Sequence, residues 1–368
     1  MGRAQFFHTY DEIISVENLV EAWREFEGGK RGRADIQQFE RHLMSNILAL
    51  NGRLAARTYQ HSGYEAFAVS DPKPRCIHKA SVSDRVLHRA VYRLLYPDFD
   101  RTFVADSFSC RVGKGTHRAL DRFRALAREV SRNHTRTCWV LKCDIRKFFA
   151  SVNHGVLLGL LRERIVDEDI MRLFVEIIGS FSPGLPLGNL TSQLFANVYL
   201  NPLDHFVKHR LKPQGYVRYA DDFVLLSDCR DCLELHIEPI RAFLRERLLL
   251  DLHPDKLFLK SVASGVDFLG WVHFPDHRVL REATKRRMFR RTDEHPTQET
   301  LASYSGMLEH GNAHHVRSGF PPEFIPAKAG TGMTMAVDSA LAPSVHLGDT
   351  KSLRHRHDHS LYRPQGVP

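Results

Sequence analysis

Long hydrophobic runs are missing from this sequence: no uninterrupted apolar stretch is long enough to span a bilayer, and residues 1–8 lack the apolar core of a signal peptide. Cysteine is scarce, with six residues whose spacing fits no disulfide framework. These absences argue against a membrane-spanning protein and against a small secreted domain held by disulfides. We therefore expect a cytoplasmic protein with reduced thiols.

Acidic side chains are also in short supply relative to basic ones. The 368 residues carry 52 Lys and Arg against 43 Asp and Glu, a formal net charge of +9. A basic chain favours polyanionic partners, nucleic acid first. Because 43% of the residues are hydrophobic, the chain can bury a substantial core, and its length predicts two or three domains or one enzyme with subdomains.

Two cysteines, Cys229 and Cys232, lie close together with His236 nearby. This spacing fits half of a zinc site, but no second pair of ligands accompanies it. The interpretation that we favour places the pair at the start of the helix that follows.

Two adjacent carboxylates, Asp221 and Asp222, separate the short apolar runs 216–218 and 223–227. The runs predict the strands of a β-hairpin, and Tyr219-Ala220-Asp221-Asp222 predicts its tight turn. Rigid strands on either side would hold the acidic oxygens where they can bind a hard divalent cation. The alternative is that the pair forms only a solvated turn.

Another carboxylate, Asp144, ends the strand-like run 137–143. If the two strands bring Asp144 next to Asp221, the two carboxylates form a two-metal site for phosphoryl transfer.

Helical periodicity covers much of the remaining chain. Apolar residues at helical spacing predict helices within residues 19–26, 36–50, 86–95, 119–130, 190–206 and 233–248. We expect Pro97 to end the third of these and Pro202 to kink or divide the fifth. Residues 64–80 predict a β-hairpin whose loop carries Lys73 and Arg75. The order of helices and strands indicates an α+β fold rather than a doubly wound one.

After residue 320 the periodicity ends, and Pro, Gly, Ala, Ser and Thr dominate. We expect residues 321–368 to form a disordered tail. His355, His357 and His359 lie there among charged residues, and we interpret them as part of a polar tail rather than a metal site.

The pattern around the carboxylates resembles a known family. Asp144 is followed five positions later by the aromatic Phe149, the later hairpin carries Tyr-Ala-Asp-Asp, and several ordered blocks match between residues 67 and 271. Together they resemble the palm of a reverse transcriptase. The resemblance implies a right-hand polymerase with fingers, a palm built of an antiparallel sheet packed by helices, and a short or truncated helical thumb.

The resemblance also implies the metal ligands and the catalytic groups. Two Mg²⁺ ions would be bound by Asp144, the main-chain carbonyl of Ile145 and Asp221, with Asp222 as the third carboxylate beside them. Lys256 matches a lysine that protonates the departing pyrophosphate, which makes it a candidate general acid. The alternative is a solvated lysine after a helix.

Other matching positions are implied to bind the dNTP. Phe149 corresponds to the aromatic steric gate that crowds a 2′-hydroxyl and so selects deoxynucleotides. Lys73 and Arg75 correspond to the fingers cations that close on the triphosphate. The loop 107–115 resembles the block that supports the template strand, and residues 266–271 resemble the primer grip.

The block at 184–193 is implied to form the dNTP pocket, with Leu187, Gly188 and Gln193, and to contact the template. This block departs from the pattern of most reverse transcriptases. Within residues 184–193 that pattern has Gln-Gly and Ser-Pro, whereas this chain has Leu187-Gly188 and Ser192-Gln193. The departure resembles the reverse transcriptases of diversity-generating retroelements. An aliphatic residue cannot hydrogen-bond the incoming nucleotide, which implies low fidelity, particularly opposite template adenines.

The resulting division of the chain has five parts: a helical basic region at 1–60, fingers at 61–135, a palm at 136–275 with a helical insertion at 155–183, a partial thumb at 276–320 and the tail. Residues 324–330 resemble translated intergenic repeat sequence, and we hypothesise that the reading frame or gene end is disrupted and that the authentic thumb is truncated.

The resemblance implies an RNA template, a DNA or RNA primer and dNTPs as partners, and a small basic accessory protein besides. Alternatives are an antiphage-defence reverse transcriptase and an inactive RNA-binding remnant with a truncated thumb. A group II intron maturase would need a splicing domain after the thumb, and a retron enzyme usually keeps the glutamine and proline that are missing here.

Overall fold

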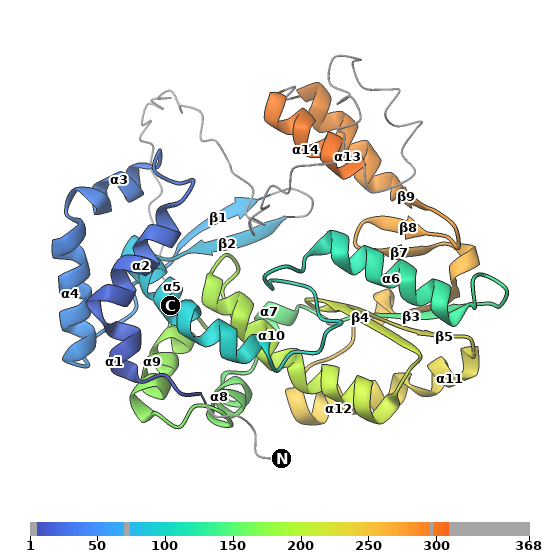
Figure 1. Cartoon of the computed structure of the whole chain (residues 1–368), viewed down its shortest axis with the longest axis horizontal. Helices are drawn as coiled ribbons and strands as arrows, with labels where there is room; N and C mark the ends of the chain where they lie inside the picture. Colours follow the sequence, from blue (N-terminus) through green and yellow to red (C-terminus); the bar gives the residue numbers. More distant parts are fainter. Residues whose placement is uncertain (1–5, 70–73, 295–296, 309–368) are drawn as a thin grey trace, which may run out of the picture. The chain divides into compact units, whose positions relative to one another are not determined.

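The computed structural model describes residues 6–69, 74–294 and 297–308 (Figure 1). Four helices begin this part of the chain: α1 (Tyr10–Ile14), α2 (Val16–Glu27), α3 (Ala34–Arg41) and α4 (Leu43–Ala55). Apolar side chains at helical spacing, among them Leu19, Trp23 and Phe26, are buried where these helices pack together and against α5 (Val82–Asp100). The predicted helical start of the chain is confirmed.

The predicted hairpin at 64–80 is also confirmed. Strands β1 (Glu65–Val69) and β2 (Arg75–Lys79) pair antiparallel, with Val69 opposite Arg75. The hairpin therefore presents Arg75 at the start of its second strand. Lys73 lies outside the described residues.

A four-stranded antiparallel sheet holds the predicted carboxylates. Its order is β4 (Gly215–Tyr219), β5 (Asp222–Ser227), β3 (Trp139–Asp144) and β6 (Phe258–Ser261). Alternate side chains of these strands enter two different hydrophobic cores, as the pleat requires. Leu141, Tyr216 and Phe223 join one core with α10 (Leu190–Phe206) and α12 (Ile237–Leu248), whereas Val140 and Val217 join another core with α6 (Thr116–Val130). The sheet is thus covered on both faces.

Shorter elements connect these layers. They are α7 (Phe148–Ser151), α8 (His154–Arg162), α9 (Glu168–Gly179), the π-helical turn η1 (Val207–Leu211), α11 (Arg230–Leu235) and the 3-10 turns η2 (Pro254–Lys256) and η3 (Val262–Ser264). A three-stranded sheet of β7 (Val266–Phe268), β8 (Trp271–His273) and β9 (Arg278–Leu280) follows, and then α13 (Glu282–Glu294) and α14 (Gln298–Leu308). Antiparallel sheets packed by helices confirm the predicted α+β class.

Three helix boundaries differ from the prediction. Helix α5 runs through Pro97 to Asp100, and α10 runs undivided through Pro202, because both helices continue to bury apolar side chains beyond the proline, such as Phe99 and Leu203. The single helix predicted for 233–248 is two helices that meet at His236.

Cys229 and Cys232 form a disulfide at the start of α11, where the Cys229 sulfur also accepts a hydrogen bond from the Cys232 amide. The prediction that the pair begins a helix is confirmed, and the expectation of reduced thiols is wrong for these two. Cys76, Cys110, Cys138 and Cys143 are free.

Within the described ranges, no helix combines the length and the apolar composition needed to cross a membrane. The predicted tail at 321–368 and the part of the predicted thumb from residue 309 onward lie outside the described part of the chain.

Candidate active site

The Tyr-Ala-Asp-Asp turn closes the hairpin of β4 and β5, as predicted. Tyr219 pairs with Asp222, which leaves Ala220 and Asp221 as the two residues of the turn. Ala220 has a φ of 53°, a left-handed conformation that costs free energy for a residue with a Cβ.

Strand β3 brings Asp144 to the same end of the sheet. Asp144 is the register partner of Asp222 across the β3–β5 ladder, and the Ile145 amide donates a hydrogen bond of 3.2 Å to the Asp221 carbonyl. The Asp144 carbonyl accepts a hydrogen bond of 2.8 Å from the His253 amide. The main chain around both carboxylates is therefore fixed by hydrogen bonds.

The carboxylates of Asp144, Asp221 and Asp222 repel one another and are partly buried. Burial raises the pKa of Asp221, and the charge of Asp144 raises it further, while Lys256 and Arg75 act in the opposite direction. Burial also raises the pKa of Asp222, to about 7, against the opposing charge of Lys142. Crowded carboxylates of this kind favour a bound cation.

Lys256 reaches this cluster from η2. Its Nζ lies 2.9 Å from Oδ1 of Asp144, and its side chain remains about two-fifths exposed. Lys256 therefore does not simply point into solvent, as the alternative interpretation had it. An ammonium group beside Asp144 can both hold that carboxylate and deliver a proton to a departing group.

Lys142 is a member of the cluster that sequence reasoning missed. Its Nζ lies 3.1 Å from Oδ2 of Asp222 and 3.0 Å from the Asp267 carbonyl. The signal was present, because Lys142 stands two residues before Asp144 and side chains at alternate strand positions share a face. Asp222 is consequently directed to Lys142.

The oxygen atoms of Asp144 and Asp221 fit a metal ion that takes only a few of its ligands from the protein. Among the residues that the structure describes, no three His, Cys, Asp or Glu side chains converge as a complete metal site. Asp144 and Asp221 nevertheless lie close enough for the charge of Asp144 to raise the pKa of Asp221, the Ile145 main chain is hydrogen-bonded to Asp221, and the buried Oδ1 of Asp222 has no hydrogen-bond partner. Mg²⁺ suits such a set because it takes one or two carboxylates and completes its shell with water and phosphate oxygens.

The block at 184–193 contacts the hairpin of β1 and β2 directly. The His78 amide of β2 donates to the Leu187 carbonyl at 2.9 Å, and the Asn189 side chain donates to the His78 carbonyl at 3.1 Å. A Cβ on Gly188 would lie 2.7 Å from Cγ2 of Ile77, so only glycine allows this approach. Leu187 is therefore held beside the strand that begins with Arg75. Gln193 follows in the first turn of α10.

Phe149 is joined to the same block. Its ring packs against the buried Phe148 with 5.3 Å between ring centroids, and its carbonyl accepts a hydrogen bond of 2.7 Å from the Leu185 amide. A Cβ on Gly184 would lie 2.1 Å from that carbonyl. Phe149 thus lies on α7, five residues after Asp144, with the block packed against its main chain.

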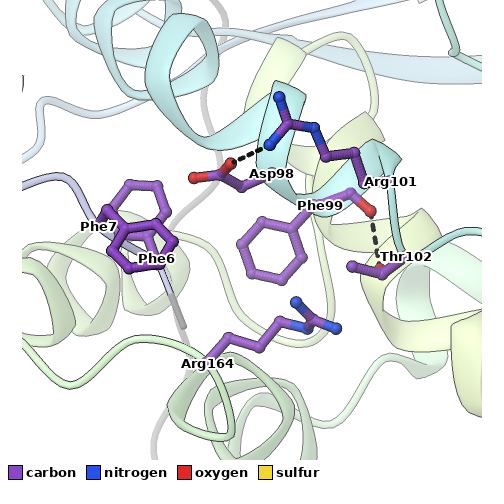
Figure 2. A pocket seen from close by; sticks show the side chains of 7 residues that line it. All are labelled: Phe6, Phe7, Asp98, Phe99, Arg101, Thr102 and Arg164. Atoms are coloured by element: carbon purple, nitrogen blue, oxygen red, sulfur yellow. Dashed lines mark hydrogen bonds and ion pairs between the residues drawn. The ribbon is translucent and has the colours of Figure 1, made fainter. Parts of the chain in front are cut away.

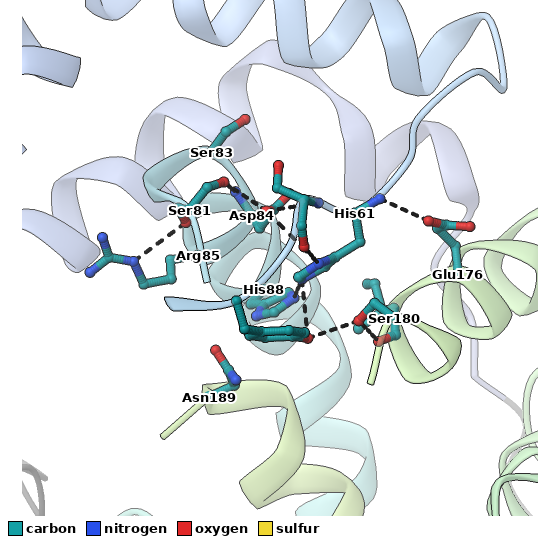
Figure 3. A network of polar contacts seen from close by, with 12 residues as sticks. His61, Ser81, Ser83, Asp84, Arg85, His88, Glu176, Ser180 and Asn189 are labelled. Carbon is teal, nitrogen blue, oxygen red and sulfur yellow. Dashed lines mark hydrogen bonds and ion pairs between the residues drawn. The ribbon is translucent and has the colours of Figure 1, made fainter. Parts of the chain in front are cut away.

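A polar network fixes the root of the hairpin (Figure 3). Asp84, fully buried on α5, accepts hydrogen bonds from Tyr59 at 2.7 Å and from Ser81 at 2.7 Å. His61 lies 3.2 Å from His88 through their Nε2 atoms. The network joins the residues on either side of β1 and β2 to α5.

A cavity of about 190 Å³ lies elsewhere, lined by Phe6, Phe7, Asp98, Phe99, Arg101, Thr102 and Arg164 (Figure 2). It contains none of the residues that sequence reasoning assigned to the active site. The acidic cluster lies instead at the end of the four-stranded sheet where β3 and the turn between β4 and β5 meet.

Comparisons with known proteins relate the chain to one family. The family model described as Reverse transcriptase (RNA-dependent DNA polymerase) matches residues 70–273. Protein YkfC of Escherichia coli is 26% identical, covering 59% of this chain and 66% of YkfC. The group II intron-encoded protein LtrA of Lactococcus lactis is 23% identical, covering 58% of this chain and 46% of LtrA.

The chain therefore spans less than two thirds of the length of these curated relatives. Among solved structures, apo telomerase from Candida tropicalis aligns with a TM-score of 0.47 and 12% identity, over 77% of this chain and 60% of that chain.

Proposed function

The chain belongs to the reverse transcriptase family, and from this premise we propose that it is the error-prone polymerase of a diversity-generating retroelement, which adds dNTPs to a primer 3′ end by two-metal phosphoryl transfer. Family membership supports the activity of an RNA-directed DNA polymerase and the right-hand fold. One observation carries the finer proposal: the aliphatic Leu187 occupies the pocket block beside strand β2.

An aliphatic side chain at this position lowers the penalty for a mispair. A polar side chain there would hydrogen-bond a correctly seated nucleotide and lose that bond to an incorrect one, whereas leucine has no such bond to lose. Because Leu187 is held by the strand that carries Arg75, we infer that it faces the nucleotide whose triphosphate Arg75 binds. Lys73 would add a second cation to that phosphate group.

Asp144, Asp221 and the Ile145 carbonyl would hold the two Mg²⁺ ions, which supply positive charge to activate the primer hydroxyl and to stabilise the departing pyrophosphate. The chain's own residues have complementary roles. Lys256 holds the Asp144 carboxylate and can protonate the pyrophosphate, Lys142 holds Asp222, and Phe149 excludes a 2′-hydroxyl.

The test is extension of a DNA primer on an RNA template with Mg²⁺ and dNTPs, with the products sequenced. We expect extension with errors concentrated opposite template adenines, no extension by Asp221→Asn, and fewer of those errors in Leu187→Gln. Asp231→Asn, which alters a carboxylate that is 88% exposed on α11, is the matched control and should behave as the wild type. A wild type that extends no primer, or an error spectrum that Leu187→Gln leaves unchanged, contradicts the proposal.

The relatives favour a second candidate, a reverse transcriptase of the group II intron type, because LtrA is described as intron-encoded. That candidate predicts accurate synthesis by the wild type. Synthesis without any template would instead indicate the antiphage-defence alternative, and RNA binding without synthesis would indicate an inactive remnant. The diversity-generating proposal includes a cytoplasmic enzyme that works with a small basic accessory protein, which a pull-down with the neighbouring gene products tests.

A further inference from the structure

A buried arginine lies directly behind the catalytic turn. Arg218, in β4, is fully buried, and its guanidinium makes two hydrogen bonds to Asp204 of α10: Nε to Oδ1 at 2.6 Å and Nη2 to Oδ2 at 2.7 Å. The Tyr216 hydroxyl donates to the same Oδ1 at 2.7 Å. A bidentate, fully desolvated pair of this kind holds the guanidinium plane in one orientation.

The remaining nitrogen of that guanidinium reaches the turn itself. Nη1 donates to the Ala220 carbonyl at 3.1 Å and to the Asn197 side chain at 3.3 Å. Ala220 is the residue with the left-handed φ of 53°, a conformation that alanine adopts only when its surroundings hold it there. Because the Ala220 carbonyl belongs to the peptide plane that leads into Asp221, fixing the carbonyl fixes the main chain of Asp221.

The main chain of Arg218 contacts a third element. Its amide donates to the Asp106 carbonyl at 2.9 Å, and its carbonyl accepts from the Phe108 amide at 2.9 Å. The Asn197 side chain also donates to the Ser109 carbonyl at 2.9 Å. The loop at 107–115, helix α10 and the catalytic turn therefore meet at one residue, and α10 begins directly after the Leu187 block.

We propose that Arg218 is a positioning residue for polymerisation: it fixes the turn that carries Asp221 by binding the Ala220 carbonyl, and it ties that turn to α10 and to the loop 107–115. This inference rests on the proposed role of Asp221 in catalysis. The part that concerns the geometry of the turn does not depend on that role, so the two are tested separately.

The main test is Arg218→Lys in the full chain. Lysine keeps the positive charge for Asp204, but one ammonium cannot match both carboxylate oxygens and the Ala220 carbonyl. We expect hydrogen exchange of the amides at 219–223 to become at least about 10-fold faster, because the turn loses the contact that holds it closed. In primer extension we expect kcat to fall on the order of 100-fold, with the KM for primer–template little changed.

The matched control is Tyr216→Phe. It removes one hydrogen bond from the same Asp204 carboxylate and so weakens the same buried cluster, but it leaves the contact between Arg218 and Ala220 in place. We expect a lower melting temperature with wild-type exchange at 219–223 and near wild-type kcat. The proposal is overturned if Arg218→Lys leaves exchange at 219–223 unchanged, or if Tyr216→Phe accelerates that exchange equally. If the wild type lacks polymerase activity, the exchange comparison still decides whether Arg218 fixes the turn, and the role in polymerisation fails together with the proposed function.

Discussion

Gly188 lies where any side chain would strike the hairpin of β1 and β2. Its φ of 104° and the 2.7 Å distance from an added Cβ to Ile77 both disfavour alanine. We predict that Gly188→Ala displaces β2, and with it Arg75, and raises the KM for dNTP about 10-fold or more, because charge-assisted contacts to the triphosphate are lost. Steady-state kinetics on a primed RNA template measures this. Gly159→Ala, where an added Cβ meets nothing within 4 Å on α8, is the control and should slightly stabilise the protein.

Phe149 and Phe148 are neighbours with different expected roles. Phe149 is partly buried, whereas Phe148 is a core residue. We predict that Phe149→Ala admits ribonucleotides and lowers the ratio of dNTP to rNTP incorporation at least about 10-fold, the effect of removing steric exclusion. Phe148→Ala should instead cost about 3–5 kcal/mol of stability and leave that ratio unchanged. Equal sugar selectivity in wild type and Phe149→Ala would show that Phe149 is not the gate.

The residues predicted from the sequence are placed by local conformation, whereas those that were missed are placed by the register between strands. Asp144, Asp221 and Asp222 stand at strand ends and in a turn, where a few adjacent residues determine the conformation. The spacing of Lys142 from Asp144 predicts a shared strand face, but its contact with Asp222 depends on which strand lies beside which. Arg218 was missed because its partner Asp204 lies 14 residues away in the sequence. Local pattern alone does not give that register.

At the scale of elements, strands and the turn were predicted well, and helix ends less well. Pro97 was expected to end its helix and Pro202 to kink or divide its helix, yet α5 continues past Pro97 and α10 is not divided at Pro202. Leu95 and Phe99 on either side of Pro97 are buried, so tertiary packing outweighs the lost hydrogen bond. Helix α5 packs against α2 and α10, which are distant from Pro97 in the sequence, so the residues around the proline do not reveal this packing.

At the end of helix α12, Leu249 adopts a left-handed backbone conformation that is unfavourable for leucine. Leu249 has a φ of 51° at the C-terminal cap and is more than half exposed. We predict that Leu249→Gly stabilises the protein by about 0.5–1 kcal/mol, because glycine adopts this conformation without a Cβ clash. Chemical denaturation measures the change. Leu48→Gly, at an exposed position inside α4, should destabilise by about 1 kcal/mol, and stabilisation by both variants or neither would contradict the cap argument.

For the whole molecule, two buried histidines link stability to pH. Burial lowers the pKa of His88 to about 3 in the network of Figure 3, and burial likewise lowers the pKa of His273 on β8 to about 3. Both must be uncharged in the folded state, while in the unfolded chain they titrate near pH 6.5. The free energy of unfolding that these two uncharged histidines contribute is fully present above pH 6.5. It is lost as the pH falls from 6.5 toward 3, because the unfolded state then binds more protons than the folded state.

Asp222 acts in the opposite direction over part of the same range. Its folded pKa of about 7 lies above the unfolded value, so the folded state binds the extra proton there, and the stability it contributes is lost as the pH rises toward 7. The pH dependence of the wild type alone is therefore a sum of opposed effects. Comparing the wild type with a His88 variant, both of which keep Asp222, separates the histidine contribution from that of Asp222.

We predict that His88→Gln flattens the acid limb of the stability curve. An uncharged amide keeps hydrogen-bonding capacity towards His61 but takes up no proton, so the stability difference from wild type should change by up to about 1.4 kcal/mol per pH unit between pH 6 and 4. Urea denaturation at half-unit pH steps measures that difference. His209→Gln, at an exposed position, should run parallel to wild type. If His88→Gln runs parallel as well, His88 is protonated in the folded state and the root of the hairpin carries a charge that burial was expected to exclude.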